Sequence, residues 1–168
     1  MRLAEYTDYT LRVLMYCAAR PQERVTIAEI AERHALSKNH LMKVVNDLGR
    51  QGLLETTRGR GGGLRLLADP TAVRVGDVVR ACETDFRLVE CFDPAVNECS
   101  LTSGCRLKQV FDGALSAFLR ELDGATLAEI SEPPARPRAG AGVAAKSRPG
   151  VVAMPVPKRR AARAGGAR

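Results

Sequence analysis

The sequence predicts a mainly α-helical fold: a winged helix-turn-helix with a small β-wing, then a cysteine-bearing loop and a long C-terminal dimerisation helix. Three observations predict it. Apolar residues recur at helical spacing in three successive segments near the N-terminus. A turn rich in glycine and arginine follows them, between two short apolar strands. Three cysteines then lie within fifteen residues, directly before a long amphipathic segment.

Three helices are expected before the wing. The first ends before Pro21, which cannot continue a helix. Thr26 and Glu29 form a capping box that begins the second helix. Ser37 is a good N-cap for the third helix, and Gly52 closes it. The apolar faces of the three helices are, in order, Leu11, Leu14, Met15 and Ala18; Ile27, Ile30, Ala31 and His34; and Leu41, Val44, Val45 and Leu48.

The second and third helices are joined by a tight connection at residues 35–36, which is helix-turn-helix spacing. The third helix presents polar side chains near its N-terminus, away from its apolar face. A recognition helix needs such groups to reach base edges in the major groove. The candidate DNA contacts on this helix are Ser37, Lys38, Asn39, His40 and Lys43.

Two short apolar strands, residues 53–57 and 64–67, flank the turn at residues 58–63 and predict a β-wing. Its glycines permit a tight reversal and close approach to DNA. Arg58 and Arg60 are placed to enter a minor groove or hold phosphates. A solvated hairpin is the alternative for the turn alone. A phosphate-cradling loop is excluded because no Gly-Lys-Ser/Thr follows. The order of helices, wing and charge predicts DNA binding.

Charge divides the chain of 168 residues, whose net charge is +7. Residues 1–67 hold eleven basic and seven acidic side chains, residues 68–131 six and eleven, and residues 132–168 nine and one. The N-terminal part and the tail are therefore candidate nucleic-acid surfaces. We expect a DNA-binding domain at 1–82, a cluster-binding loop and dimerisation helix at 83–130, and a disordered basic tail at 131–168. The tail either adds non-specific attraction to phosphates or has no function of its own.

The sequence also indicates where in the cell the protein resides. No apolar run is long enough to span a bilayer, and residues 1–8 lack the apolar core of a signal peptide. We expect a cytoplasmic protein without membrane association, whose thiols stay reduced and available to metal.

The three clustered cysteines are Cys91, Cys99 and Cys105. Pro94 and Gly104 favour a loop there. Three thiols cannot pair off among themselves, so a disulfide framework explains them poorly. They suit an iron–sulfur cluster or zinc, each of which usually needs a fourth ligand. The remaining cysteines, Cys17 and Cys82, fall on apolar helical stripes and are interpreted as buried structural residues.

After the cysteine loop, residues 107–122 form a long helical pattern with a wide apolar face. A domain this small has little core left to cover it, which favours a homodimer over packing within one chain. A dimer would also set two recognition helices on successive major grooves. The face comprises Leu107, Phe111, Ala114, Leu115, Phe118, Leu119 and Leu122.

Five stretches carry a resemblance to a known family: residues 6–12, 37–45, 58–63, 88–92 and 105–108. Over about residues 1–130, the chain resembles the winged-helix iron–sulfur regulators that respond to cysteine metabolism, iron–sulfur biogenesis, iron or nitric oxide. It looks most like the nitric-oxide-sensing branch. The resemblance implies a homodimeric transcriptional repressor, not an enzyme, that binds a double-stranded DNA operator.

The resemblance also implies a cofactor, most simply a 4Fe-4S cluster held by Cys91, Cys99 and Cys105, with Asp8 of the partner subunit as fourth ligand. An N-cap role for Asp8 or a pair with Arg12 is the alternative. The iron–sulfur-biogenesis branch holds a 2Fe-2S cluster with a histidine after its third cysteine, and none follows Cys105 here. The iron-responsive branch shares the cysteine spacing and remains an alternative. A zinc-stapled structural DNA-binding protein is a further alternative.

Overall fold

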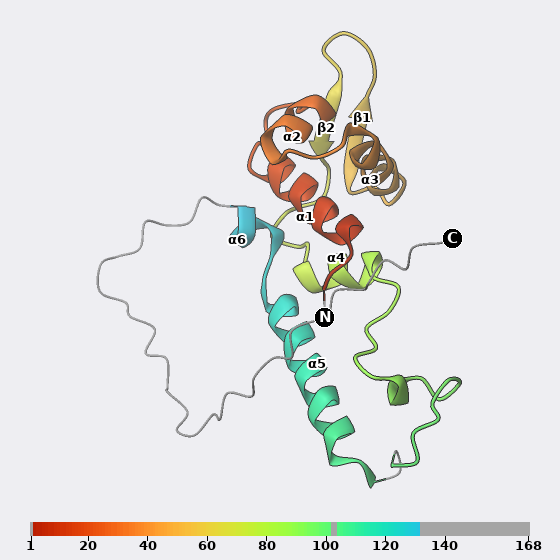
Figure 1. Cartoon of the computed structure of the whole chain (residues 1–168). Coiled ribbons are helices and arrows are strands. Elements are labelled where there is room, and N and C mark those ends of the chain that lie inside the picture. Colours follow the sequence, from red (N-terminus) through yellow and green to blue (C-terminus); the bar gives the residue numbers. More distant parts are fainter. Residues whose placement is uncertain (1, 102–103, 132–168) are drawn as a thin grey trace, which may run out of the picture. The chain divides into compact units, whose positions relative to one another are not determined.

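The computed structural model describes residues 2–101 and 104–131. The tail predicted at 131–168 lies outside the described residues, apart from Ser131 at the end of the last helix. Figure 1 shows the order of the elements along the chain. They are α1 (Glu5–Ala18), α2 (Ile27–His34), α3 (Lys38–Arg50), β1 (Leu54–Thr57), β2 (Gly63–Leu66), α4 (Val75–Cys82), the short 3-10 helix η1 (Glu90–Phe92), α5 (Arg106–Gly124) and α6 (Leu127–Ser131).

The helix-turn-helix is confirmed, with α2 and α3 joined through a left-handed Ala35 (φ 53°). The capping box forms as expected: the Thr26 hydroxyl accepts from the Glu29 N–H at 3.2 Å, and the Glu29 carboxylate accepts from the Thr26 N–H at 2.6 Å. Helix α3 buries the expected apolar face. Ser37 is its N-cap residue by position, but its side chain makes no capping hydrogen bond.

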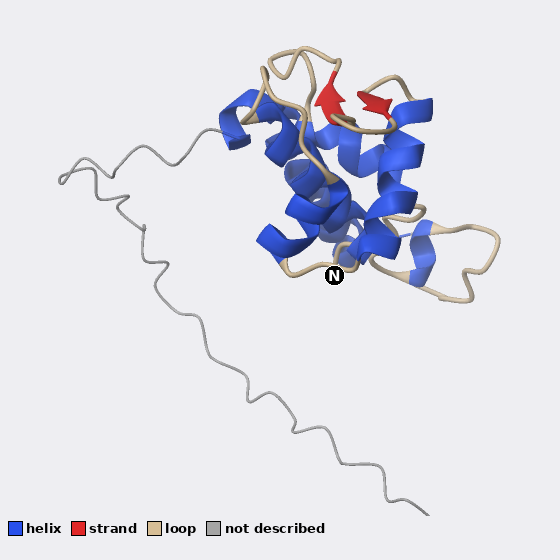
Figure 2. Ribbon diagram, turned by 90° about the horizontal axis from the view of Figure 1, so that it is seen from above, coloured by secondary structure: helices blue, strands red, loops and turns tan. Residues whose placement is uncertain are grey.

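The wing is a two-stranded antiparallel hairpin in which Leu54 pairs with Leu66 and Thr57 with Gly63. Val25, just before α2, forms an isolated bridge to Leu64 and so ties the hairpin to the helices. Gly59 and Gly61 reverse the chain at the tip with φ of 94° and 78°, a region that side chains other than glycine rarely adopt. Figure 2, from above, shows the hairpin beside the helices.

Helix α1 is the centre of the core, and its buried face differs from the expected one. The fully buried residues are Thr7, Thr10, Val13, Leu14 and Cys17, whereas Leu11, Met15 and Ala18 are only partly covered. The difference arises because α1 packs against α3, α4 and α6 together. Its buried hydroxyls are satisfied: Thr10 donates to the Tyr6 carbonyl at 2.8 Å, and Thr7 donates to Glu83 at 2.6 Å.

Helix α5 packs against α4 and buries none of its own residues completely. Figure 1 shows it running from the cysteine-bearing loop back towards the helical core. At its C-terminal end, both Asp123 carboxylate oxygens accept from Arg80, at 2.5 and 2.6 Å. Helix α6 then returns the chain to the core through Leu127, which is 1% exposed. Within the described ranges, no helix is both long and apolar enough to cross a membrane.

Gly76 lets α4 approach α5 closely, because a Cβ there would overlap the Asp123 carboxylate and crowd Arg80. We predict that Gly76→Ala is less favourable than Gly113→Ala by about 0.5–1 kcal/mol, since Asp123 must leave its exposed ion pair with Arg80 to make room. Gly113→Ala in α5 is the matched control, because its Cβ would meet nothing within 4 Å. It should stabilise by about 0.5–1 kcal/mol, the usual gain of alanine over glycine in a helix. Thermal unfolding at one protein concentration measures both, and equal shifts for the two variants would contradict the packing argument.

Candidate nucleic-acid interface and cysteine loop

The side chains predicted to read DNA are gathered at the start of α3. Ser37, Lys38, Asn39, His40 and Lys43 are all exposed, while the opposite face of the helix is buried. This half-buried arrangement fixes the helix and leaves its N-terminal polar groups available to base edges and phosphates. Their role as DNA contacts stays a prediction.

Two tyrosines of α1 lie against the recognition helix, a contact that sequence analysis missed. The Tyr9 ring stacks on His40 with centroids 6.0 Å apart, and Lys43 Nζ lies 5.6 Å from the Tyr6 ring centroid. The Tyr6 hydroxyl donates to Asp47 at 2.9 Å. Burial, followed by this hydrogen bond, raises the pKa of Tyr6 to about 12, so the phenol stays a donor at neutral pH. Helix α1 therefore helps to orient α3, and the three-residue spacing of the tyrosines was the available signal.

The wing carries its predicted arginines at the tip and a polar network at its base. Arg58 and Arg60 are exposed, and neither side chain forms an ion pair or hydrogen bond within the described part of the chain. At the base, Arg24 donates to Thr57 at 2.7 Å and to Glu55 at 3.1 Å. The wing is thus anchored to the helices while its two tip cations remain available to an anion.

The three clustered cysteines lie where the sequence places them, on an irregular segment before α5. Cys91 lies in η1, Cys99 follows in the loop, and Cys105 is the N-cap residue of α5. All three are half-buried. Among the described residues, no three His, Cys, Asp or Glu side chains come together closely enough to hold a metal ion. The single chain therefore supplies thiol donors of the right chemistry on one loop, without assembling them.

Asp8 lies in the first turn of α1, and its carboxylate binds Arg12 one turn later. Arg12 Nε donates to one oxygen at 3.0 Å, and a terminal nitrogen lies 2.8 Å from the other. The Asp8 side chain is 46% exposed. The structure thus contains the Arg12 pair that sequence analysis gave as an alternative. The role of Asp8 as a ligand from a partner subunit stays a prediction.

The remaining cysteines differ from one another. Cys17 is 2% exposed, as expected, and burial raises its pKa to about 12. Cys82 is only half-buried, so the expectation of a fully buried residue was wrong for it. Its side chain lines a cavity of about 370 Å³ together with Thr10 and Leu48. Burial still raises the pKa of Cys82.

Comparison with known proteins gives a family match over nearly the whole described chain. The model of the Rrf2 family, described as iron-dependent transcriptional regulators, matches residues 3–133. The HTH-type transcriptional regulator NsrR of Bacillus subtilis strain 168 is 52% identical over 131 residues, covering 77% of this chain and 90% of the relative. The regulator of the same name from Geobacillus kaustophilus is 47% identical over 133 residues, covering 79% and 90%.

Solved structures of similar proteins share the fold. The oxidized form of Staphylococcus aureus CymR superposes with a TM-score of 0.63 at 26% identity, covering 79% of this chain and 98% of CymR. IscR of T. potens superposes with a TM-score of 0.60 at 25% identity, covering 77% and 85%. The expected winged helix is therefore confirmed, and the curated relatives are named as transcriptional regulators rather than enzymes.

The cysteine environments predict a labelling order in the metal-free, reduced chain. Because the thiolate is the reacting form, a pKa of about 12 leaves Cys17 on the order of 1000-fold less reactive than an ordinary thiol. Cys91, Cys99 and Cys105 should be alkylated by iodoacetamide first, Cys82 later and Cys17 last. Peptide mass spectrometry over time measures the order, and the chain unfolded in guanidinium, where all five should react alike, is the control. Early labelling of Cys17 would contradict its placement in the core.

Proposed function

The chain belongs to the Rrf2 family of transcriptional regulators, and from that premise we propose that it is a homodimeric repressor that senses nitric oxide through an iron–sulfur cluster. The observation that carries the proposal is its 52% identity over 131 residues to a regulator named NsrR. The family match at residues 3–133 includes both the winged helix and the cysteine loop. Nitric oxide as the signal comes from the resemblance of the sequence to the nitric-oxide-sensing branch.

The donor set fits an iron–sulfur cluster. Thiolates are the usual ligands of such clusters, and Cys91, Cys99 and Cys105 place three half-buried thiols on the irregular segment between α4 and α5. We propose that these three residues and the partner subunit's Asp8 hold a 4Fe-4S cluster. When bound, the cluster would supply iron that reacts with nitric oxide.

A second copy of the chain is the proposed cover for α5. This helix has no fully buried residue, and Leu107 and Val110 near its start are 60% and 64% exposed. Apolar area of this kind beside a small core is typical of a homodimer interface. Two copies related by a two-fold axis would present two α3 helices to the two halves of a palindromic operator.

The proposed switch lies at Asp8. A carboxylate is a hard ligand and exchanges from iron–sulfur iron more readily than a thiolate. A released Asp8 has Arg12 of its own helix available, as the ion pair in the structure shows. The same turn of α1 contacts α3 through Tyr6 and Tyr9. A change there can alter how α3 meets DNA, and a 100-fold loss of operator affinity needs only about 2.7 kcal/mol.

Anaerobic titration of the iron- and sulfide-reconstituted chain with nitric oxide tests the proposal. Visible absorbance should bleach in step with release of operator DNA, followed by fluorescence anisotropy. Asp8→Ala should still load iron but react with nitric oxide at a changed rate, because the exchangeable ligand is missing. Glu5→Ala, in the same turn and exposed, is the matched control for the cluster: its iron loading and its rate of reaction with nitric oxide should equal those of the unaltered chain.

Two other outcomes would replace the proposal, and a third would change only its ligand set. A colourless chain that binds zinc points to a zinc-stapled structural DNA-binding protein. A cluster indifferent to nitric oxide, but lost with DNA binding under iron chelation, indicates an iron-responsive or iron–sulfur-status repressor of the same family. Unchanged kinetics in Asp8→Ala would remove that carboxylate from the ligand set.

The DNA contacts are predicted to divide into two classes. Asn39→Ala and His40→Ala should weaken operator binding by about 1–3 kcal/mol relative to random DNA, because they are placed to reach base edges. Arg58→Ala and Arg60→Ala should weaken both kinds of DNA, each lowering the slope of log affinity against log salt by about 0.9, as expected for a lost phosphate contact.

Arg120→Ala, which removes an exposed cation from α5, is the control for these variants and should change neither quantity. Binding titrations at several salt concentrations, with operator and random duplexes, separate the two classes. Equal losses for Arg60→Ala and Arg120→Ala would show that net charge, rather than the wing, governs affinity.

A further inference from the structure

The segment around the cysteine loop is strongly acidic and contains a single cation. Residues 81–105 include Glu83, Asp85, Glu90, Asp93 and Glu98, as well as the three clustered cysteines. The only Lys or Arg in this range is Arg87. Because thiolates bound to iron add further negative charge, the placement of this one cation matters for the whole segment.

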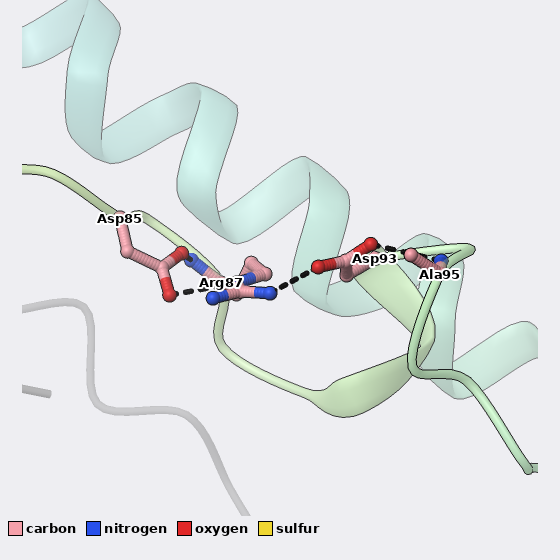
Figure 3. Close-up of polar contacts among 4 residues, drawn as sticks. All are labelled: Asp85, Arg87, Asp93 and Ala95. Atoms are coloured by element: carbon pink, nitrogen blue, oxygen red, sulfur yellow. Dashed lines mark hydrogen bonds and ion pairs between the residues drawn. The ribbon is translucent and has the colours of Figure 1, made fainter.

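Arg87 joins the two carboxylates that flank the turn carrying Cys91, as Figure 3 shows. Its backbone N–H donates to one oxygen of Asp85 and its Nε to the other, both at 2.7 Å. Its Nη1 donates to the Asp93 carboxylate. The other Asp93 oxygen accepts from the Ala95 N–H at 2.9 Å, which continues the chain of contacts into the loop.

The contact between Arg87 and Asp93 closes residues 87–93 into a ring, and η1 with Cys91 is part of this segment. Outside the ring, Glu83 accepts from the Ala4 N–H at 2.8 Å and from Thr7, so the segment before Asp85 is fixed to α1. The segment before the turn of Cys91 is thus attached to the folded core through Glu83. The turn itself is closed by the contact between Arg87 and Asp93.

The contribution of these ion pairs to global stability is small, because the Arg87 and Asp85 side chains are 46% and 40% exposed. Their consequence is local. The planar guanidinium engages two carboxylates at once, which a lysine ammonium cannot reproduce with the same geometry. The backbone of residues 87–93 is therefore restricted before any metal binds, and this restriction includes the turn that carries Cys91.

We propose that Arg87 is a positioning residue for the cluster: it holds the turn of Cys91 in place and offsets the acidic charge of the loop, and so governs how firmly iron is retained. The inference rests on the proposed function, since it assumes that Cys91 ligates iron. It assigns Arg87 no contact with iron or with nitric oxide, so the residue acts only through Asp85, Asp93 and the backbone between them.

The test compares iron retention in the unaltered chain and in Arg87→Gln, both reconstituted anaerobically with iron and sulfide. After an iron(II) chelator is added, loss of visible absorbance should be on the order of tenfold faster in Arg87→Gln, the usual scale for residues that orient a metal ligand. Visible circular dichroism should also change, because the surroundings of Cys91 are altered. Asp93→Asn should reproduce both effects, and Arg87→Lys should restore part of the retention.

The double variant Arg87→Gln/Asp93→Asn should lose iron no faster than the worse single variant, because both changes open the same contact. Arg106→Gln is the matched control, since Arg106 is an exposed cation directly after Cys105 but outside the closed ring. It should retain iron as the unaltered chain does. Thermal unfolding of the metal-free variants should be unchanged, which separates positioning from a general loss of structure.

Each other result overturns the inference. Iron retention in Arg87→Gln equal to that of the unaltered chain removes the role of Arg87. If Arg106→Gln loses iron as fast as Arg87→Gln, the effect is one of net charge. If the effects of the two changes on iron loss add in the double variant, Arg87 and Asp93 act independently. If the unaltered chain binds no iron and sulfide, the proposed function itself fails and the inference fails with it, whereas the first three results leave that function standing.

Discussion

The burial of α1 is the constraint on which the rest of the structure depends. This helix contacts α2, α3, α4, α6 and β2, so it joins the DNA-reading part to the segment that leads into the cysteine loop. Its core face includes two threonines, whose hydroxyls need hydrogen-bond partners inside the protein because both residues are buried. Thr10 satisfies this requirement within the helix, whereas Thr7 needs Glu83 at the end of α4. The position of α1 is therefore specified by hydrogen bonds as well as by apolar packing.

The first turns of α1 divide their side chains among several neighbours. Helical spacing sends successive residues in different directions, so Tyr6 meets Asp47 on α3, Thr7 meets Glu83 after α4, and Asp8 meets Arg12 on its own helix. Contacts made by adjacent residues cannot be changed independently, because the backbone between them is a rigid helix. The same turn therefore bears on both the recognition helix and the approach to the cysteines.

Sequence patterns predicted those parts of the fold that depend on local periodicity and capping. The buried face of α3, the capping box at Thr26 and the reversal at Gly59 are properties of a few consecutive residues, and all three are observed. The buried face of α1 was misjudged because a search for apolar spacing passes over Thr7 and Thr10. The bridge made by Arg87 was missed because it depends on the fold of a loop. The cysteines were found as a set by their clustering, but their spacing does not specify the fold of the loop, and the described chain does not bring them together.

The incomplete burial of α5 has a consequence for the cell as well as for the molecule. Were two copies to share this face, as proposed, the folded and paired state would be favoured by mass action, and its population would rise with the amount of protein made. A chain at low abundance would then be a poor repressor even with every ligand in place. The threshold for response would be set jointly by the chemical signal and by expression of the regulator itself, so a change in promoter strength would shift sensitivity without altering a residue.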